Sequence, residues 1–118
     1  MSFKENNLIQ HKTFDFALRI IKFYTICKSQ NEYILSKQIL RCGTSIGANV
    51  EEAIAAQSKK DFISKLSIAN KEARETKYWL KLYQSSNLVQ IEVDSSLKEI
   101  ESIINILTKI IKTSSENL

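Results

Sequence analysis

The segment from Ile39 to Leu82 reads ILRCGTSIGANVEEAIAAQSKKDFISKLSIANKEARETKYWLKL, and its pattern decides the fold. Two stretches of apolar residues at helical spacing are separated by a helix-capping signal at Ser58. The only two glycines of the chain, Gly43 and Gly47, lie four residues apart inside the first stretch. Charged and amide side chains fall on or beside both apolar stripes. The segment therefore predicts two long helices whose contact includes polar groups.

The stretch after Ser58 has the most regular spacing in the chain. Ser58 and Asp61 resemble a capping box, which predicts a helix that starts at Ser58 and continues to about Ser85. Asn87 follows, and asparagine tolerates the left-handed conformation that often ends a helix. The apolar seam advances alternately by four and three residues through Phe62, Leu66, Ala69, Ala73, Thr76, Leu80 and Tyr83. This spacing is typical of a helix in a left-handed bundle.

The preceding stretch predicts a helix from about Glu32 to Ala56. Its seam has the same alternate spacing and consists of Leu35, Ile39, Cys42, Ile46, Asn49, Ala53 and Ala56. Each glycine inside a helix costs roughly 1 kcal/mol relative to alanine. Close approach of a neighbouring helix at Gly43 and Gly47 would offset that cost. A local kink, or glycines that are simply tolerated, is the alternative.

Two further helices are expected outside this segment. The first runs from about Thr13, as the capping residue, to Ser29, with an inward stripe of Phe14, Ala17, Ile20 or Ile21, and Tyr24. The last starts near Asp94 or Ser96, where Ser96 and Glu99 form a second possible capping box. Its seam is Leu97, Ile100, Ile104, Leu107 and Ile111. Further isoleucines at 103, 106 and 110 widen this face, which suggests that it contacts both its own bundle and a neighbouring subunit.

Length and composition indicate a single all-α domain. The chain has 118 residues, no proline and two glycines, which favours helices over a β-structure. We predict an antiparallel up-down-up-down four-helix bundle spanning residues 1–118, with a polar segment at 1–12 and a frayed tail at 113–118. No apolar run is long enough for a membrane span and the start lacks a signal-peptide core, so we expect a cytoplasmic protein. Cys27 and Cys42 are then expected to be reduced and buried.

Paired carboxylates at 51/52 and 72/75 raise the possibility of a di-metal site, which bundles build from Glu and Glu-x-x-His motifs. The chain has no such histidine motif, and His11 lies before the first predicted helix. We therefore predict no metal, no cofactor, no catalytic residues and no enzymatic activity. We expect the carboxylates instead to pair with Arg41, Arg74 or Lys77, or to cap backbone groups. The polar residues expected in or beside the core, where they fix helix register, are Asn49, Glu52, Glu72, Glu75 and Arg41.

The remaining functional signal is positive charge. The formal net charge is +4, and residues 1–60 hold nine Lys/Arg against five Asp/Glu. Cations recur on one side of the helix after Ser58 at Lys71, Arg74, Lys77 and Lys81, and its start adds Lys59 and Lys60. Arg19 and Lys22 of the first helix could extend this face. Clustered cations suit phosphate groups of RNA or DNA; a solvated helix face is the alternative.

The central segment also resembles a known family. The residues that carry the resemblance are Gln38-x-x-Arg41, Thr44-Ser45-Ile46-x-Ala48-Asn49-Val50-x-Glu52-Ala53, Ser58-Lys59-x-Asp61-Phe62 and Ala69-x-Lys71-Glu72-Ala73-x-Glu75-Thr76-x-Tyr78-Trp79-Leu80. The chain resembles bacterial four-helix bundle proteins encoded in intervening sequences of 23S ribosomal RNA genes, also labelled S23 ribosomal proteins. The resemblance covers roughly residues 13–112.

This resemblance implies an up-down bundle that assembles into ring-shaped homopentamers and has no established enzymatic activity. The chain is also similar to accessory proteins of diversity-generating retroelements, which use a basic surface to engage nucleic acid and a reverse transcriptase. Two hypotheses follow. The protein is a homo-oligomer that binds RNA or DNA through a basic surface, or it is a structural or protein-interaction scaffold, such as a reverse-transcriptase accessory protein, with no nucleic-acid binding of its own.

Overall fold

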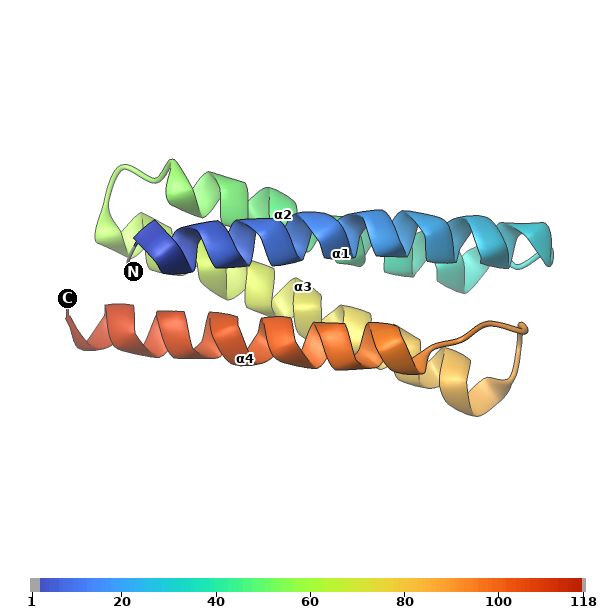
Figure 1. Ribbon diagram of the computed structural model, residues 1–118. Helices are drawn as coiled ribbons and strands as arrows, with labels where there is room; N and C mark the ends of the chain where they lie inside the picture. The colour runs from blue at the N-terminus through green and yellow to red at the C-terminus, as the bar shows by residue number, and fades with distance from the viewer. Residues whose placement is uncertain (1–2, 118) are drawn as a thin grey trace.

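Four α-helices make up nearly all of the computed structural model, which describes residues 3–117. The helices are α1 (Phe3–Ser29), α2 (Ile34–Ile54), α3 (Lys59–Ser86) and α4 (Asp94–Glu116). They run lengthwise beside one another, and the start of α1 and the end of α4 lie at the same end of the bundle (Figure 1). The body measures 47 × 20 × 20 Å, as expected of helices that rise 1.5 Å per residue. The structure is the all-α four-helix bundle that the sequence predicts.

Each helix packs against two neighbours. α2 lies between α1 and α3, and α4 lies between α3 and α1, so that α1 and α3 occupy a diagonal of the bundle. The contact between α1 and α4 is the least extensive of the four. Side chains on the outward faces of α1 and α3 therefore point to opposite sides of the molecule.

The helix α3 follows its sequence prediction closely. The Asp61 N–H donates to Ser58 Oγ at 3.1 Å, and Asn87 ends the helix in the left-handed conformation, with φ of 53°. The predicted seam is buried from Leu66 to Tyr83, whereas Phe62 is half-buried. The regular spacing and the two caps together account for this helix.

The helix α2 is shorter than predicted, because Glu32 and Ala56 lie outside it. The buried seam includes the predicted Ile39, Cys42, Ile46 and Ala53. Val50 is buried where Asn49 was expected, and Asn49 is half-buried, with its Nδ2 donating to the Ser45 carbonyl at 2.9 Å. The prediction that placed Asn49 on the seam was wrong, because the neighbouring valine fills the core without leaving an amide to satisfy.

The helix α1 begins at Phe3 and includes most of the segment predicted to precede it. Thr13 is therefore no cap: it is buried within the helix, and its hydroxyl donates to the Ile9 carbonyl at 2.7 Å. The buried apolar residues are Ile9, Phe16, Ile20, Phe23 and Cys27. The predicted inward residues Phe14 and Ile21 are 64% and 46% exposed. This helix has apolar side chains on opposite sides. Of the predicted stripe, Ile20 is buried and Ala17 and Tyr24 are half-buried, so the prediction was wrong at Phe14 and at the alternative Ile21.

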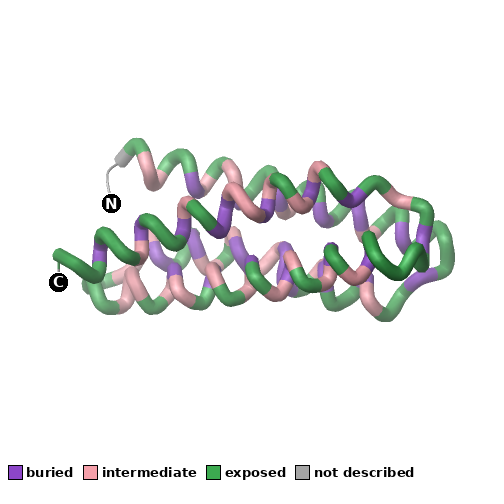
Figure 2. Tube along the Cα trace, turned by 90° about the horizontal axis from the view of Figure 1, so that it is seen from below, coloured by how far each residue is buried: buried purple, intermediate pink, exposed green. Residues whose placement is uncertain are grey.

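The helix α4 also differs from its prediction at both ends. Glu92 caps its first turn, accepting from the Ser95 N–H at 2.8 Å, while Ser96 is buried inside the helix. The predicted frayed tail is helical through Glu116, and Ser114 is buried. The isoleucines that widen the apolar face are buried or half-buried within the bundle, whose inward positions are coloured purple in Figure 2. The bundle itself therefore covers the face that was expected to contact another subunit.

Both glycines of α2 face α1. A Cβ atom at Gly43 would lie 2.9 Å from both Cγ1 and Cγ2 of Ile20, closer than real Cβ contacts. A Cβ atom at Gly47 would lie 3.4 Å from the Thr13 carbonyl oxygen, which is an ordinary contact. α2 remains one continuous helix through both positions. Close helix packing thus has a physical basis at Gly43 and a weaker one at Gly47.

Candidate nucleic-acid interface

Cations gather along the outward side of α3. Helical spacing places on this side a set that we call the α3 basic face, consisting of Lys60, Lys71, Arg74, Lys77 and Lys81. Four of them are exposed, and Lys77, which is half-buried, forms an ion pair with Glu101 of α4. That cation, together with Lys81 and Arg74, holds the pKa of Glu101 below its usual range. The face thus contains more cations than the single opposing carboxylate neutralises.

Of the two lysines at the start of α3, only Lys60 belongs to the α3 basic face. Lys60 is exposed and lies on the same side as Lys71, whereas Lys59 donates through Nζ to the Asn117 carbonyl at the end of α4. This bond joins the start of one helix to the end of another, and it occupies one donor of a cation that was predicted to contact nucleic acid. On α4, whose lysines were not among the predicted binding residues, Lys98, Lys109 and Lys112 are exposed as well. Their spacing of eleven and three residues was a usable signal, since it places them on one side of a helix.

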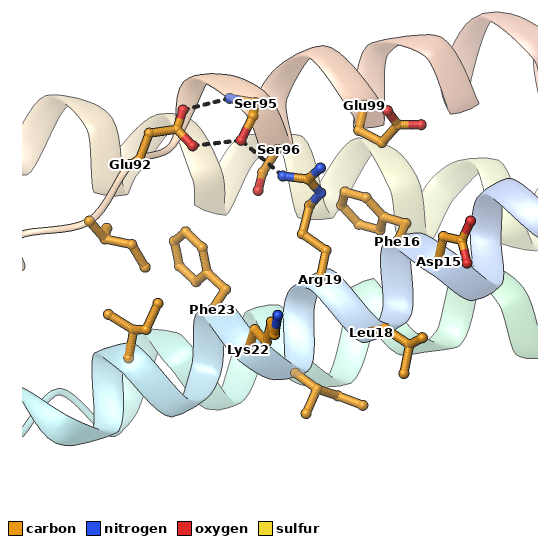
Figure 3. Close-up of a pocket in the computed structure, with 13 residues that line it drawn as sticks. Asp15, Phe16, Leu18, Arg19, Lys22, Phe23, Glu92, Ser95, Ser96 and Glu99 are labelled. Atoms are coloured by element: carbon orange, nitrogen blue, oxygen red, sulfur yellow. Dashed lines mark hydrogen bonds between the residues drawn. The ribbon is translucent and has the colours of Figure 1, made fainter.

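Arg19 and Lys22 do not extend the α3 basic face, because α1 lies diagonally across the bundle from α3. They line a groove of about 860 Å³ between α1, the α3–α4 loop and the first turn of α4 (Figure 3). Arg19 donates to Ser95 Oγ at 2.9 Å. Hydrogen bonds from Ser95 and the nearby Arg19 charge keep the pKa of Glu92 below its usual range. The groove combines both signs of charge with exposed apolar side chains, unlike a phosphate-binding surface.

A polar network connects α2 to α3 at the surface. Arg41 pairs with Glu72 at 3.4 Å and with Glu75 at 2.5 Å, and Glu75 also accepts from the Trp79 Nε1–H at 3.1 Å. Glu75 of α3 is thereby held by Arg41 of α2 and by Trp79 of α3. The predicted ion pairs between Arg41 of α2 and the glutamates of α3 are present. They lie at the surface, along the edge where α2 meets α3, and not in the core.

Glu52 is farther from the core than the sequence prediction placed it. Its side chain is exposed and pairs with Lys65 at 3.4 Å. Exposed pairs of this kind typically contribute only about 0–1 kcal/mol. Glu52 therefore does not act as a polar residue of the core, because its position on α2 directs it to solvent.

Among residues 3–117 the buried carboxylate is that of Glu32, whose place in the sequence predicted only the start of a helix. Its carboxylate accepts from the N–H groups of Ile34, Leu35 and Ser36 at 2.8–2.9 Å and from the hydroxyl of Tyr83. Burial opposes ionisation of Glu32, but these four hydrogen bonds outweigh it and lower its pKa. A glutamate at the start of a predicted helix was the available signal, since the first N–H groups of a helix lack internal partners.

The two cysteine thiols lie in surroundings that make them poor nucleophiles. Cys27 and Cys42 are free and buried, and burial raises the pKa of Cys42 to about 11. His11 is exposed on α1. Over residues 3–117, no group of three or more His, Cys, Asp or Glu side chains could hold a metal ion. None of the helices described is both long and apolar enough to cross a bilayer.

The fold and the site define a small four-helix bundle protein with a basic surface on one helix. Residues 5–110 match the model of the 23S rRNA-intervening sequence protein family, and the chain belongs to that family. A solved structure from Bacteroides thetaiotaomicron, a protein of unknown function from the S23 ribosomal protein family, is 45% identical. The alignment covers 92% of this chain and 98% of that one, with a TM-score of 0.86. No curated protein matched this chain.

Proposed function

We propose that this chain is a non-enzymatic, homo-oligomeric bundle protein that binds RNA or DNA through the α3 basic face. The observation that carries the proposal is the set of exposed cations on one side of a long rigid helix. Each cation that contacts a phosphate releases counterions, and this release favours binding at low salt. The exposed lysines of α4, the neighbouring helix, supply further positive charge.

Removing three exposed charges from this face is expected to weaken binding and reduce its salt dependence. The variant carries Lys71→Gln, Arg74→Gln and Lys81→Gln. Each lost phosphate contact lowers the slope of log affinity against log salt by about 0.7–0.9, so the slope should fall by about 2 to 3. Fluorescence anisotropy with a labelled structured RNA, between 50 and 200 mM salt, roughly the sensitive range, measures both quantities.

The matched control removes the same net charge elsewhere, through Lys22→Gln, Lys28→Gln and Lys37→Gln on α1 and α2. These lysines are exposed and lie outside the α3 basic face. An equal loss of affinity in both variants would show that binding depends on net charge alone and not on the α3 basic face. No salt-sensitive binding by the natural chain, to RNA or to DNA, would contradict the proposal.

The assembly part of the proposal rests on an apolar surface of α1 that the rest of the bundle, over residues 3–117, leaves about half exposed or more. Phe14, Leu18 and Ile21 lie opposite the buried stripe of this helix and are 64%, 51% and 46% exposed. Exposed apolar groups at helical spacing are typical of a contact with another helix. We propose that a second copy of this chain covers them. The face is on α1, across the bundle diagonal from α3, so a contact between the α1 faces of two copies leaves the α3 basic face open.

The substitution Leu18→Glu is expected to convert the oligomer into a monomer of 13.6 kDa. A charge placed on this face would have to be desolvated in the assembly, whereas in the monomer it remains in water. Light scattering coupled to gel filtration gives the mass, and circular dichroism checks the fold. Leu88→Glu, at a residue 54% exposed in the α3–α4 loop, is the control and should leave the mass unchanged. An unchanged mass for Leu18→Glu would exclude this face as the contact.

The α1 surface also supports a second candidate function. A scaffold that binds other proteins, such as a reverse transcriptase, requires an exposed apolar face but no phosphate-binding cations. The scaffold is favoured if assembly is observed while RNA and DNA both fail to bind. The α3 and α1 variants thus separate the two candidate functions.

A further inference from the structure

We propose that Tyr78 is a stacking platform for unpaired bases, so that the α3 basic face prefers single-stranded nucleic acid to duplex. The proposal rests on the proposed nucleic-acid binding and specifies its substrate. Tyr78 is 57% exposed. It follows Arg74 by four residues and precedes Lys81 by three, so its ring lies among the cations on the same side of α3.

The position of Tyr78 is supported by its neighbour. The rings of Tyr78 and Trp79 meet edge-to-face, with centroids 5.4 Å apart and an interplanar angle of 69°. Trp79 is fixed in turn by its hydrogen bond to Glu75, which Arg41 of α2 holds by an ion pair. The network joining α2 to α3 therefore orients an exposed aromatic ring. A ring held in place before binding loses less conformational entropy when a base stacks on it.

An exposed aromatic ring beside cations suits a strand whose bases are free. Aromatic side chains stack on unpaired bases of any sequence, while cations along the same groove or face contact the phosphates. In a duplex the bases already stack on one another, and only the backbone is available to such a surface. Along the helix axis, Tyr78 lies about 10 Å from Lys71 and about 5 Å from Lys81. Base and phosphate contacts can thus be made by one short strand.

The test compares Tyr78→Ala with Tyr78→Phe, using a labelled 12-nucleotide RNA, the same sequence as DNA, and a blunt duplex of equal length. Tyr78→Ala is expected to weaken single-strand binding about tenfold or more, as removal of one base–aromatic stack does. Its salt dependence should stay unchanged, because no phosphate contact is lost. Tyr78→Phe should bind like the natural chain. Duplex affinity should be the same for all three proteins.

Trp79 is the only tryptophan of the chain and reports on the same contact. Its fluorescence should change when a single strand binds the natural chain or Tyr78→Phe, and respond less in Tyr78→Ala. An abasic strand of equal length should bind the natural chain and Tyr78→Ala equally.

Several outcomes would overturn the inference, and they differ from a failure of the proposed function. If Tyr78→Ala binds the single strand as tightly as the natural chain does, Tyr78 does not stack on bases. The same follows if the variant loses as much affinity for the duplex and the abasic strand as for the single strand. If the natural chain binds no nucleic acid at all, the proposed function itself fails. A changed oligomeric mass in Tyr78→Ala would instead assign the ring to a contact between copies.

Discussion

Replacement of Glu32 by alanine is expected to lower the free energy of unfolding by about 3 kcal/mol. The carboxylate is buried and accepts hydrogen bonds from three N–H groups in the first turn of α2. Without it these donors lose their partners, and the buried Tyr83 hydroxyl keeps only the weakly hydrogen-bonding Cys27 thiol beside it. Urea unfolding followed by circular dichroism measures the change, with an m-value equal to that of the natural chain if unfolding stays two-state.

The control for this prediction is Glu92→Ala. Glu92 caps the first turn of α4 in a similar way, accepting from the Ser95 N–H and hydroxyl, but it is fully exposed. Water can replace those hydrogen bonds, so the loss of stability should be much smaller. Equal losses in the two variants would show that capping alone, and not burial, explains the effect of Glu32.

The pH dependence gives an independent check on Glu32. Because its pKa is lower in the folded chain than the ordinary value of 4.5, the ionised carboxylate stabilises the fold fully above that value. The contribution is lost as the pH falls from about 4.5 through the lowered pKa. The stability difference between the natural chain and Glu32→Gln should therefore narrow over this acidic range. A difference that stays constant would mean that the carboxylate charge contributes little.

The sequence predicted the helices well where one apolar stripe was present. On α3, the capping serine and the seam from Leu66 to Tyr83 left no competing face. On α1, Phe14, Leu18 and Ile21 form a second stripe opposite Phe16, Ile20 and Phe23. Local spacing cannot distinguish a stripe that the bundle buries from one that remains outside. Which stripe is buried depends on the side of α1 against which α2 and α4 pack.

The candidate site was predictable along α3 but not between helices. Spacing places Lys71, Arg74 and Lys81 on one side of α3 without any knowledge of the fold. Whether Arg19 joins them depends on which helices are neighbours, and the bundle puts α1 on the diagonal. The polar network also depends on a contact between two helices. In it Arg41 of α2 pairs with Glu75 of α3, and Glu75 accepts a hydrogen bond from Trp79, whose ring contacts that of Tyr78. The sequence predicted that Glu75 pairs with a cation, but the packing of α2 on α3, and not the spacing of either helix alone, decides that the cation is Arg41.

Substitution of alanine for Gly43 tests the contact that the opening segment first indicated. The new methyl group would lie 2.9 Å from both Cγ atoms of Ile20, a buried β-branched residue that cannot turn aside. Overpacking of this kind costs about 1–3 kcal/mol, against a helix-propensity gain of about 1 kcal/mol. The difference is a net loss of up to about 2 kcal/mol in the free energy of unfolding, which urea denaturation measures.

Two comparisons decide whether this contact is the cause. Gly47→Ala gains the same helix propensity but meets Thr13 only at an ordinary distance, so it should be neutral or stabilising by up to about 1 kcal/mol. In an Ile20→Ala background the crowding atoms are removed, and Gly43→Ala should then stabilise the protein. This reversal of sign in a double-mutant cycle would measure the coupling between the two positions. If Gly43→Ala stabilises the natural chain as much as Gly47→Ala does, the glycine is not required by the approach of α1, and its place in α2 needs another explanation.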